Sequence, residues 1–281
     1  MKQKHYIALA VILASIAISG AKRKTALKLD YRQKASWHYS LHYRSDCVIV
    51  DKDSTSKIRT SVFCALEASP KGKGDRLTFT VDSVSVESQF YNDEKQKSIA
   101  EKLDGGSFGV ALIDGCPVVD TLTTFSVSEI SEWDMVIQFA KLLPDIPVGP
   151  VRKGIKWERS GVFPLMTNIG KVDCEVYRAY RLDSLSSDGQ RAHISWRFRY
   201  AALTRGVPKS QMMKRVPVSG KGRGRAAFDI KGKFLLRALV QFKTPVANYG
   251  DTQVHWLETT SLEYLPEPAD TSGSENPGEK K

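Results

Sequence analysis

Apolar and polar residues alternate with a period of two in several stretches of this chain, and that pattern constrains the fold most strongly. In residues 37–43, serine and histidine separate the large side chains of Trp37, Tyr39, Leu41 and Tyr43. Because a strand points successive side chains to opposite faces of a sheet, this alternation predicts a half-buried strand. The alternation returns in residues 75–86, 173–185 and 193–200, next to turn-forming stretches such as KGKGD and SSDGQ. The sequence therefore predicts a mainly β protein (β-rich α+β) with antiparallel strands.

Two segments depart from the alternation and favour helices. Residues 127–143 carry apolar side chains at helical spacing, with Ser126 and Glu129 as a capping box at the start and Pro144 after the end. We expect this amphipathic helix to close one side of the sheet. A shorter helix is an option over residues 93–104, DEKQKSIAEKLD.

The chain divides into two β-rich halves, residues 22–146 and 147–265, around a connector rich in proline and glycine. The pattern of residues 76–86 and 106–120 returns in residues 191–202 and 222–236, at offsets of 115 and 116 residues. This spacing favours two repeated halves, although antiparallel proteins also produce such matches by chance. The tail, residues 266–281, has no large apolar side chain and is expected to be disordered.

The N-terminus has the layout of a secretory signal peptide, residues 1–21. Lys2 and Lys4 precede an uncharged apolar run at residues 6–18, and small residues follow up to Ala21. Its removal would leave a periplasmic or extracellular protein. The alternative is an uncleaved N-terminal membrane anchor, because the cations at residues 22–24 favour the cytoplasmic side.

The formal net charge of +11 would fall to +9 on removal of the two lysines in residues 1–21. A basic protein attracts polyanions in general and selects none of them. For an exported protein, the polyanions at hand are anionic lipids and surface polymers. Export therefore argues against nucleic acid as the partner.

Four cysteines, Cys47, Cys64, Cys116 and Cys174, would reach an oxidising compartment after export. No pair has the Cys-x-x-Cys spacing, which argues against zinc and thioredoxin-like chemistry. Folding the chain about the polar turn DKDSTSK brings Cys47 opposite Cys64. We therefore expect disulfides between Cys47 and Cys64 and between Cys116 and Cys174, with four reduced and buried thiols as the alternative.

The stretch SGKGRGRAAFDIKGKF, residues 219–234, sets cations between glycines in the manner of a phosphate-binding loop. Such a loop must open a helix, because N–H groups at the helix N-terminus bind the anion. Alternation continues from Ala226 to Ile230 and a turn follows at Gly232, which predicts a β-hairpin instead. Its charge can still bind a polyanion. The candidates for a basic patch are Arg197, Arg199, Lys221, Arg223 and Arg225.

No constellation of residues in the sequence points to catalysis, a metal or a cofactor. The motifs of nucleophilic serine hydrolases and zinc proteases are absent. His38 and His42 share one face of a strand without a third ligand nearby, so we expect solvent-facing histidines there. We therefore expect a non-catalytic protein without a cofactor.

Two elements of the second half carry a resemblance. They are Pro147, Gly154 and Trp157, and then the hairpin pattern of Gly222, Gly224, Phe228, Asp229 and Gly232. On these residues the chain resembles a family of uncharacterised exported bacterial proteins, a domain of unknown function. The resemblance implies a curved antiparallel sheet or open half-barrel, loosely similar to periplasmic lipoprotein carriers, and no activity. The cysteines in the strands depart from that family's pattern.

Three functions are compatible with these features. The leading hypothesis is an envelope protein that holds an apolar or amphiphilic ligand or docks a protein partner. The alternative is binding of an anionic lipid surface or surface polymer through the basic patch. The third is an exported hydrolase whose site the sequence does not disclose. An apolar cavity with a mouth would support the first hypothesis, and a sheet filled by the helix at 127–143 would count against it.

Overall fold

The computed structural model describes residues 25–72, 75–113, 116–119, 139, 141–147, 149–167, 170–202, 219–243 and 247–266. The elements of the first half are β1 (Thr25–Ala26), the 3-10 helix η1 (Tyr31–Gln33), β2 (Trp37–Val50), β3 (Thr55–Lys71), β4 (Arg76–Ser88), α2 (Asp93–Leu103), β5 (Ser107–Ile113) and β6 (Cys116–Val119). Those of the second half are β7 (Pro150–Val151), β8 (Lys156–Thr167), β9 (Gly170–Leu185), β10 (Arg191–Ala202), β11 (Ser219–Asp229), β12 (Phe234–Lys243), β13 (Ala247–Tyr249) and β14 (Thr252–Leu265).

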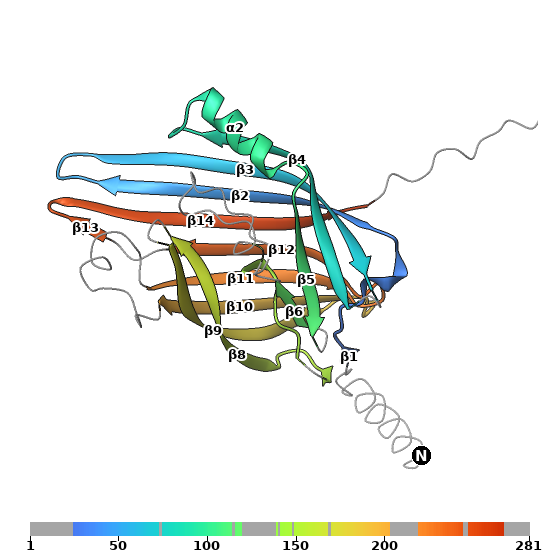
Figure 1. The fold of residues 1–281 in the computed structure, drawn as a ribbon. Helices are drawn as coiled ribbons and strands as arrows, with labels where there is room; N and C mark the ends of the chain where they lie inside the picture. The colour runs from blue at the N-terminus through green and yellow to red at the C-terminus, as the bar shows by residue number, and fades with distance from the viewer. Residues whose placement is uncertain are drawn as a thin grey trace, which may run out of the picture.

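One large antiparallel sheet dominates the molecule (Figure 1). Its strand order is β6-β5-β4-β3-β2-β14-β12-β11-β10-β9-β8, and β13 pairs with β14 outside that order. Each half is a meander of sequential strands, and the pairing of β14 with β2 joins the two meanders. The sheet curves but stays open in the described residues, with β6 and β8 as its edges, while β1 and β7 pair separately. The predicted curved antiparallel sheet is confirmed.

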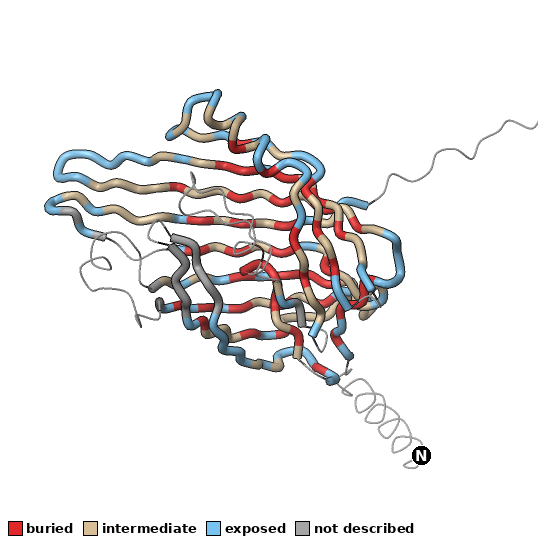
Figure 2. Tube along the Cα trace, in the orientation of Figure 1, coloured by how far each residue is buried: buried red, intermediate tan, exposed pale blue. Residues whose placement is uncertain are grey.

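Buried and less buried residues alternate along many strands of this sheet (Figure 2), and we call the face to which the buried residues point the inner face. On β2 the alternating residues Trp37, Tyr39, Leu41 and Tyr43 are each at most 2% exposed. The residues between them are half-buried and point to the opposite, outer face. The alternation in the sequence therefore assigned these side chains to the correct faces.

The short helix is confirmed as α2, between β4 and β5. It begins after Asn92, whose side chain accepts a hydrogen bond from the backbone N–H of Lys95. Such a cap satisfies a donor that the first turn of a helix leaves unpaired. Ile99 and Leu103, four residues apart and both fully buried, attach the helix to the core.

The segment of residues 139–147 lies against the inner face and contacts strands of both halves. The ring of Phe139 packs 4.5 Å from that of Phe79 and 5.0 Å from that of Phe108, on β4 and β5. Next to it, the Nζ of Lys141 lies 3.2 Å from Oε2 of Glu258 on β14, and both side chains are less than 10% exposed. These contacts connect the segment to the first half and to the centre of the sheet.

The end of the same segment contacts β8 and β9. The hydroxyl of Tyr180 donates a hydrogen bond of 2.8 Å to the carboxylate of Asp145, and Nη1 of Arg178 lies 3.5 Å from it. The indole N–H of Trp157 donates to the Asp145 carbonyl oxygen at 3.0 Å. Residues 139–147 therefore bridge the inner face from one meander to the other.

Only the end of the helix expected at 127–143 can be compared with the structure. Phe139, Lys141 and Leu142 are helical, and the N–H of Leu143 donates to the Phe139 carbonyl at 3.2 Å. Residues 127–138 and 140 lie outside the described residues, so the rest of that helix stays a prediction.

Two pairs of strands recur at the offset of 115 residues expected from the sequence, whereas β5 and β11, which begin at residues 107 and 219, do not keep the expected offset of 116. β3 and β9 begin at residues 55 and 170, and β4 and β10 begin at residues 76 and 191, an offset of 115 residues in both cases. The two halves nevertheless share one sheet and one continuous core. The domain boundaries and the duplication stay predictions.

Both ends of the chain carry predictions that fall outside the described residues. These are the signal peptide at residues 1–21 and all but the first residue of the tail at 266–281. Within the described ranges, no helix is both long enough and apolar enough to cross a membrane.

Candidate functional site

The alternation of β10 separates its aromatic and cationic side chains. Trp196, Phe198 and Tyr200 are at most 7% exposed on the inner face, whereas Arg197 and Arg199 are exposed on the outer face. The prediction that these rings belong to the core, and not to a base-stacking platform, is confirmed. What β10 offers to a ligand is therefore its row of arginines.

The next strand, β11, brings the remaining predicted cations to the same place. Lys221, Arg223 and Arg225 are all exposed, and the register sets Arg223 opposite Arg197 and Lys221 opposite Arg199. Directly opposite residues of an antiparallel pair project from the same face. The structure thus brings all five candidates of the predicted basic patch together on the outer face.

The glycines of β11 serve the packing of the inner face. A Cβ atom on Gly224 would lie 2.2 Å from the indole of Trp196, and one on Gly222 would lie 2.4 Å from the ring of Phe198. Gly220 faces two further rings in the same way. Glycine is needed because the aromatic rings of β10 lie across the backbone of β11. The glycine pattern therefore has a structural cause that does not involve phosphate.

The hairpin predicted from residues 219–234 is confirmed. β11 continues to Asp229, whose carboxylate accepts a 2.6 Å hydrogen bond from the N–H of Gly232, and β12 returns antiparallel from Phe234. The turn is tight enough that Lys233 adopts a positive φ of 56°. No helix follows the glycines, so a phosphate loop of the helix type is excluded for this stretch.

Neighbouring strands enlarge the cationic surface. On one side of the β10–β11 pair, Lys156 of β8 is opposite Arg181 of β9. On the other side, Lys243 of β12 is opposite Lys221 of β11. All of these side chains are exposed. We call the following set the basic face: Lys156, Arg181, Arg197, Arg199, Lys221, Arg223, Arg225 and Lys243. The three cations on β8, β9 and β12 were not found by the sequence analysis, because they join the patch only through cross-strand register.

A groove with a volume of about 740 Å³ crosses the basic face. It runs between two rows of outward side chains that the register defines, one through Arg181 and Arg225 and the next through Arg197 and Arg223. The lining residues are Lys156, Glu158, Ala179, Tyr180, Arg181, Ser195, Trp196, Arg197, Arg223, Gly224, Arg225, Leu239 and Gln241. The groove thus has cations on both sides.

Among the described residues, Arg181 is the one cation of the basic face with a carboxylate at ion-pair distance, since its Nε lies 3.6 Å from Oδ1 of Asp183. Within the described part of the chain, no carboxylate lies within the 4.0 Å ion-pair distance of the five cations on β10 and β11. Arg223 donates instead to the side-chain oxygen of Gln241 at 2.9 Å, and the guanidinium of Arg199 lies 5.1 Å from the ring centre of Tyr177. Like charges directly opposite each other destabilise a sheet. An anion bound in the groove would offset that cost.

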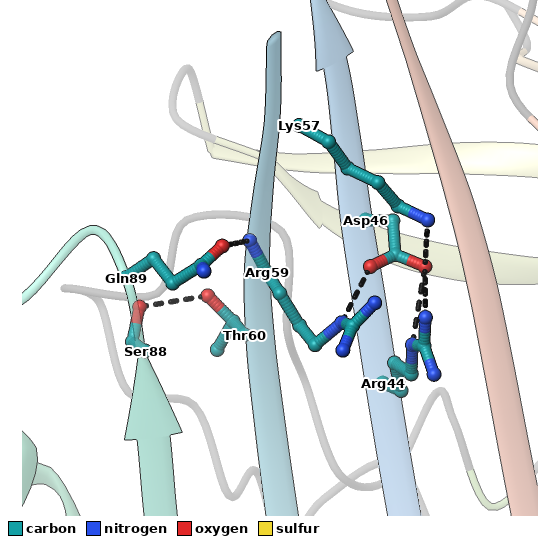
Figure 3. A network of polar contacts seen from close by, with 7 residues as sticks. All are labelled: Arg44, Asp46, Lys57, Arg59, Thr60, Ser88 and Gln89. Carbon is teal, nitrogen blue, oxygen red and sulfur yellow. Dashed lines mark hydrogen bonds and ion pairs between the residues drawn. The ribbon is translucent and has the colours of Figure 1, made fainter.

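A second cationic cluster lies on the outer face of β2 and β3 (Figure 3). The carboxylate of Asp46 receives Nε of Arg59 at 2.9 Å, Nη2 of Arg44 at 3.0 Å and Nζ of Lys57 at 3.2 Å. Burial alone would raise the pKa of Asp46, but the hydrogen bonds from these three cations together hold it below its usual value. We call these four residues the Asp46 cluster. This cluster was not predicted from the sequence, although its members lie in or near the stretch DKDSTSK, residues 51–57.

The predicted disulfide between Cys47 and Cys64 is wrong. The turn lies at residues 51–54, so Cys47 pairs with Ile58 and Cys64 pairs with Leu41. This register separates the two cysteines by six positions along the strands, roughly 20 Å, whereas disulfides need Cα atoms about 4.4–6.8 Å apart. The two thiols are not joined, and burial raises the pKa of Cys64 to about 12. The side chains of Cys116 and Cys174 fall outside the described residues, so that pair stays a prediction.

The two strand histidines are not arranged as a metal site. His42 stacks on Phe63 with ring centres 3.9 Å apart, and burial lowers the pKa of His42. The described residues contain no group of three histidine, cysteine or acidic side chains that could hold a metal ion.

The described residues of the segment 139–147 cover one part of the inner face. Phe139, Leu142 and Ile146 of the bridging segment are each at most 2% exposed and belong to the same core cluster as the strand residues. An apolar ligand bound at this part of the inner face would have to displace these side chains. Toward the other end of the same strands, the inner-face residues Cys47, Ile49 and Trp256 are only half-buried.

Comparisons with known proteins do not assign a family. No family model matches the chain, and no curated protein matches it. Among solved structures, lipovitellin matches with 9% sequence identity and a TM-score of 0.47, over 86% of this chain. This chain spans only about a quarter of lipovitellin's length, 26%.

Several other matches have bacterial sources, among them the following two. A DUF1329 family protein from Desulfovibrio piger matches with 10% identity and a TM-score of 0.18, covering 82% of this chain and 88% of that protein. A putative outer membrane lipoprotein-sorting protein domain from Vibrio parahaemolyticus matches with 10% identity and a TM-score of 0.16, covering 84% and 87%. With TM-scores below 0.5, these similarities establish neither a family nor a function for this chain.

Proposed function

We propose that this chain is a non-catalytic protein that binds a linear anionic polymer in the groove of its basic face. The observation that carries the proposal is the lining of the groove. Cations stand on both sides of it, and those on β10 and β11 have no carboxylate partner among the described residues. Arginine suits this task because its planar guanidinium keeps its charge and can donate two parallel hydrogen bonds to phosphate or carboxylate.

The dimensions favour a polymer over a single small anion. The lining residues come from five neighbouring strands, β8 to β12, so the groove is roughly 19 Å long at about 4.8 Å per interstrand interval. Successive rows of outward side chains lie about 7 Å apart. One small anion would contact a fraction of the lining, whereas an extended chain between the rows would contact cations of both.

The same geometry favours a polymer over a lipid surface or a nucleic acid. Gly224 and its neighbours line the groove between the two rows of side chains, where a flat layer of lipid headgroups would not reach. Nucleic-acid sheets stack bases on exposed aromatic rings, but the aromatic residues of β10 are buried. If the predicted export takes place, polymers of the cell envelope are the polyanions within reach.

Binding of an apolar ligand at the part of the inner face that residues 139–147 cover would require a rearrangement of the protein. The segment of residues 139–147 would have to leave the sheet and break its contacts through Phe139, Lys141 and Asp145. The basic face requires no such rearrangement, which is why we prefer it.

Binding to fluorescently labelled long-chain polyphosphate, measured by anisotropy at several salt concentrations, tests the proposal. The full-length chain should bind, and the affinity should fall as salt rises, because bound counterions are released. The triple variant Arg197→Gln/Arg223→Gln/Arg225→Gln should bind roughly 100-fold more weakly, if each cation contributes about 1 kcal/mol as at anionic surfaces.

A triple variant with the same change in net charge is the control. Lys28, Lys71 and Lys97 are exposed and lie outside β8 to β12, so their replacement by glutamine should leave most of the affinity. Equal losses in the two triple variants would mean that net charge and not the groove attracts the polymer, and the proposal would be rejected.

A further inference from the structure

A line of outward residues connects the basic face to the Asp46 cluster. The register pairs Arg199 with Lys221, Lys221 with Lys243, and Lys243 with Leu257. It then pairs Leu257 with Asp46, and Asp46 with Arg59. Directly opposite residues share a face, so these side chains form one row across the strands from β10 to β3. Leu257 is the only member of this row between the two groups of charges.

The row joins segments that are far apart in the sequence. β12 and β14 belong to the second half of the chain and β2 and β3 to the first, and the pairing of β14 with β2 makes them neighbours (Figure 1). Five interstrand intervals separate β10 from β3, which corresponds to roughly 24 Å. The row is thus longer than the groove of the basic face; it lies next to the groove's row through Arg197 and Arg223 and extends farther, to β3.

The Asp46 cluster keeps a positive charge although it contains a carboxylate. Three cations surround one acid, so the cluster has a formal charge of +2. The side chains of Arg44, Lys57 and Arg59 are 38%, 45% and 46% exposed, whereas that of Asp46 is 9% exposed. Asp46 therefore holds the cations in place from below, and the cations face the solvent.

The arginines of the cluster have donors available for a ligand. Arg59 reaches Asp46 through Nε, while a guanidinium carries five N–H donors. Arg44 is opposite Thr259, which is opposite Gln241 in the lining of the groove. The cluster consequently meets the groove along this second row as well.

From this continuity we infer that the polyanion crosses the sheet perpendicular to the strands, from the groove of the basic face over Leu257 to the Asp46 cluster. The inference rests on the proposed function and adds a length requirement to it. A chain that spans both clusters contacts more cations than the groove alone supplies, so long chains bind more tightly than short ones of the same chemistry. A short anion occupies the groove without reaching the cluster.

The test compares tripolyphosphate with long-chain polyphosphate, using the full-length protein and isothermal titration calorimetry. The double variant Lys57→Gln/Arg59→Gln should weaken long-chain binding about tenfold or more, on the scale of the contribution of surface cations. It should leave tripolyphosphate binding unchanged. The matched control Lys71→Gln/Lys97→Gln should leave both unchanged, since these exposed lysines lie outside the row.

A second variant tests the row without changing any of the cations that are ion-paired with Asp46. Leu257 is 37% exposed at the middle of the row, and Leu257→Glu would place a negative charge there. This change should weaken long-chain binding and spare tripolyphosphate, whereas Leu257→Gln should affect neither by more than about twofold. Because glutamine has nearly the same size and shape as glutamate, it controls for local disturbance of the fold.

The outcomes separate this inference from the proposed function. If Leu257→Glu and Lys57→Gln/Arg59→Gln bind long chains like their controls while Arg197→Gln/Arg223→Gln does not, the extension is wrong and the groove remains the site. If Arg197→Gln/Arg223→Gln also binds normally, the proposed function is wrong. Binding to phosphatidylserine vesicles with no binding to long-chain polyphosphate would overturn both in favour of a lipid surface.

Discussion

Replacing Gly224 with alanine places a methyl group where the ring of Trp196 lies. The new Cβ would stand 2.2 Å from Cε2 and Cζ2 of the indole, so the ring must move by about 1.2 Å to reach the 3.4 Å of an ordinary contact. Trp196 is 3% exposed, and its ring centre lies 5.9 Å from that of Tyr180, which in turn stacks on Trp157 at 5.3 Å. The ring can move only by disturbing this stack.

Two opposing effects determine how much Gly224→Ala changes the free energy of unfolding. Overpacking of a core costs about 1–3 kcal/mol. Alanine in a strand recovers about 0.5–1 kcal/mol that glycine loses in backbone entropy. We therefore expect Gly224→Ala to lower the free energy of unfolding by about 1–2 kcal/mol, with a fall in melting temperature of roughly 2–4 °C per kcal/mol.

Urea unfolding followed by circular dichroism measures this difference. Gly161→Ala on β8 is the matched control, because no atom lies within 4 Å of its added Cβ, and it should be neutral or stabilising by about 0.5 kcal/mol. In a Trp196→Ala background the ring is gone, so Gly224→Ala should cost nothing further. Unchanged stability of Gly224→Ala, or an equal loss in the Trp196→Ala background, would refute the explanation of the glycines.

Three other groups allow separate tests. Cys64, buried and with a pKa raised to about 12, should resist alkylation at pH 8 in the folded protein and react after unfolding in urea; rapid labelling of the folded protein, seen by mass spectrometry, would contradict its burial. Asp46→Asn should cost about 1–3 kcal/mol at pH 7. Because the pKa of Asp46 is lowered in the folded state, its contribution to stability is present above the unfolded pKa and is lost as the pH falls below about 4. Urea unfolding at several pH values measures the difference between Asp46→Asn and wild type. A difference that does not change with pH would contradict this role of Asp46. Lys141→Met should lower the free energy of unfolding by about 3–5 kcal/mol, and Lys141→Met/Glu258→Leu should recover at least half of that loss. If thermal unfolding shows no recovery in the double variant, the single variant does not act by breaking the ion pair.

The strands and their faces followed from the sequence because the side-chain period of a strand is local. The alternation assigned Trp196 and Phe198 to the core and Arg197 and Arg199 to the outer face, and the structure agrees. The same reasoning identified the hairpin at residues 219–234. It failed for Cys47 and Cys64, since period two defines a face but does not say which residues are opposite each other.

The site was predictable in part for the same reason. The five cations on β10 and β11 were found because each strand carries its cations within one short alternating stretch, although the register between the two strands was not predicted, since residues 203–218 separate them in the sequence. Lys156, Arg181 and Lys243 joined them through pairings on β8, β9 and β12 that composition and spacing do not reveal. The Asp46 cluster needed the register of the hairpin formed by β2 and β3.

The sequence by itself determined several of the strands, the side chains of those strands that face the core, and the cations that their outer face carries, but it did not reveal β8 or β14. Only the tertiary structure decided that β14 pairs with β2, and hence that cations near residues 59 and 243 lie in one row. Local alternation records a preference of each residue for apolar or aqueous surroundings, which is encoded position by position. Pairing between segments some 200 residues apart depends on how the whole core packs, and no short stretch of sequence encodes it.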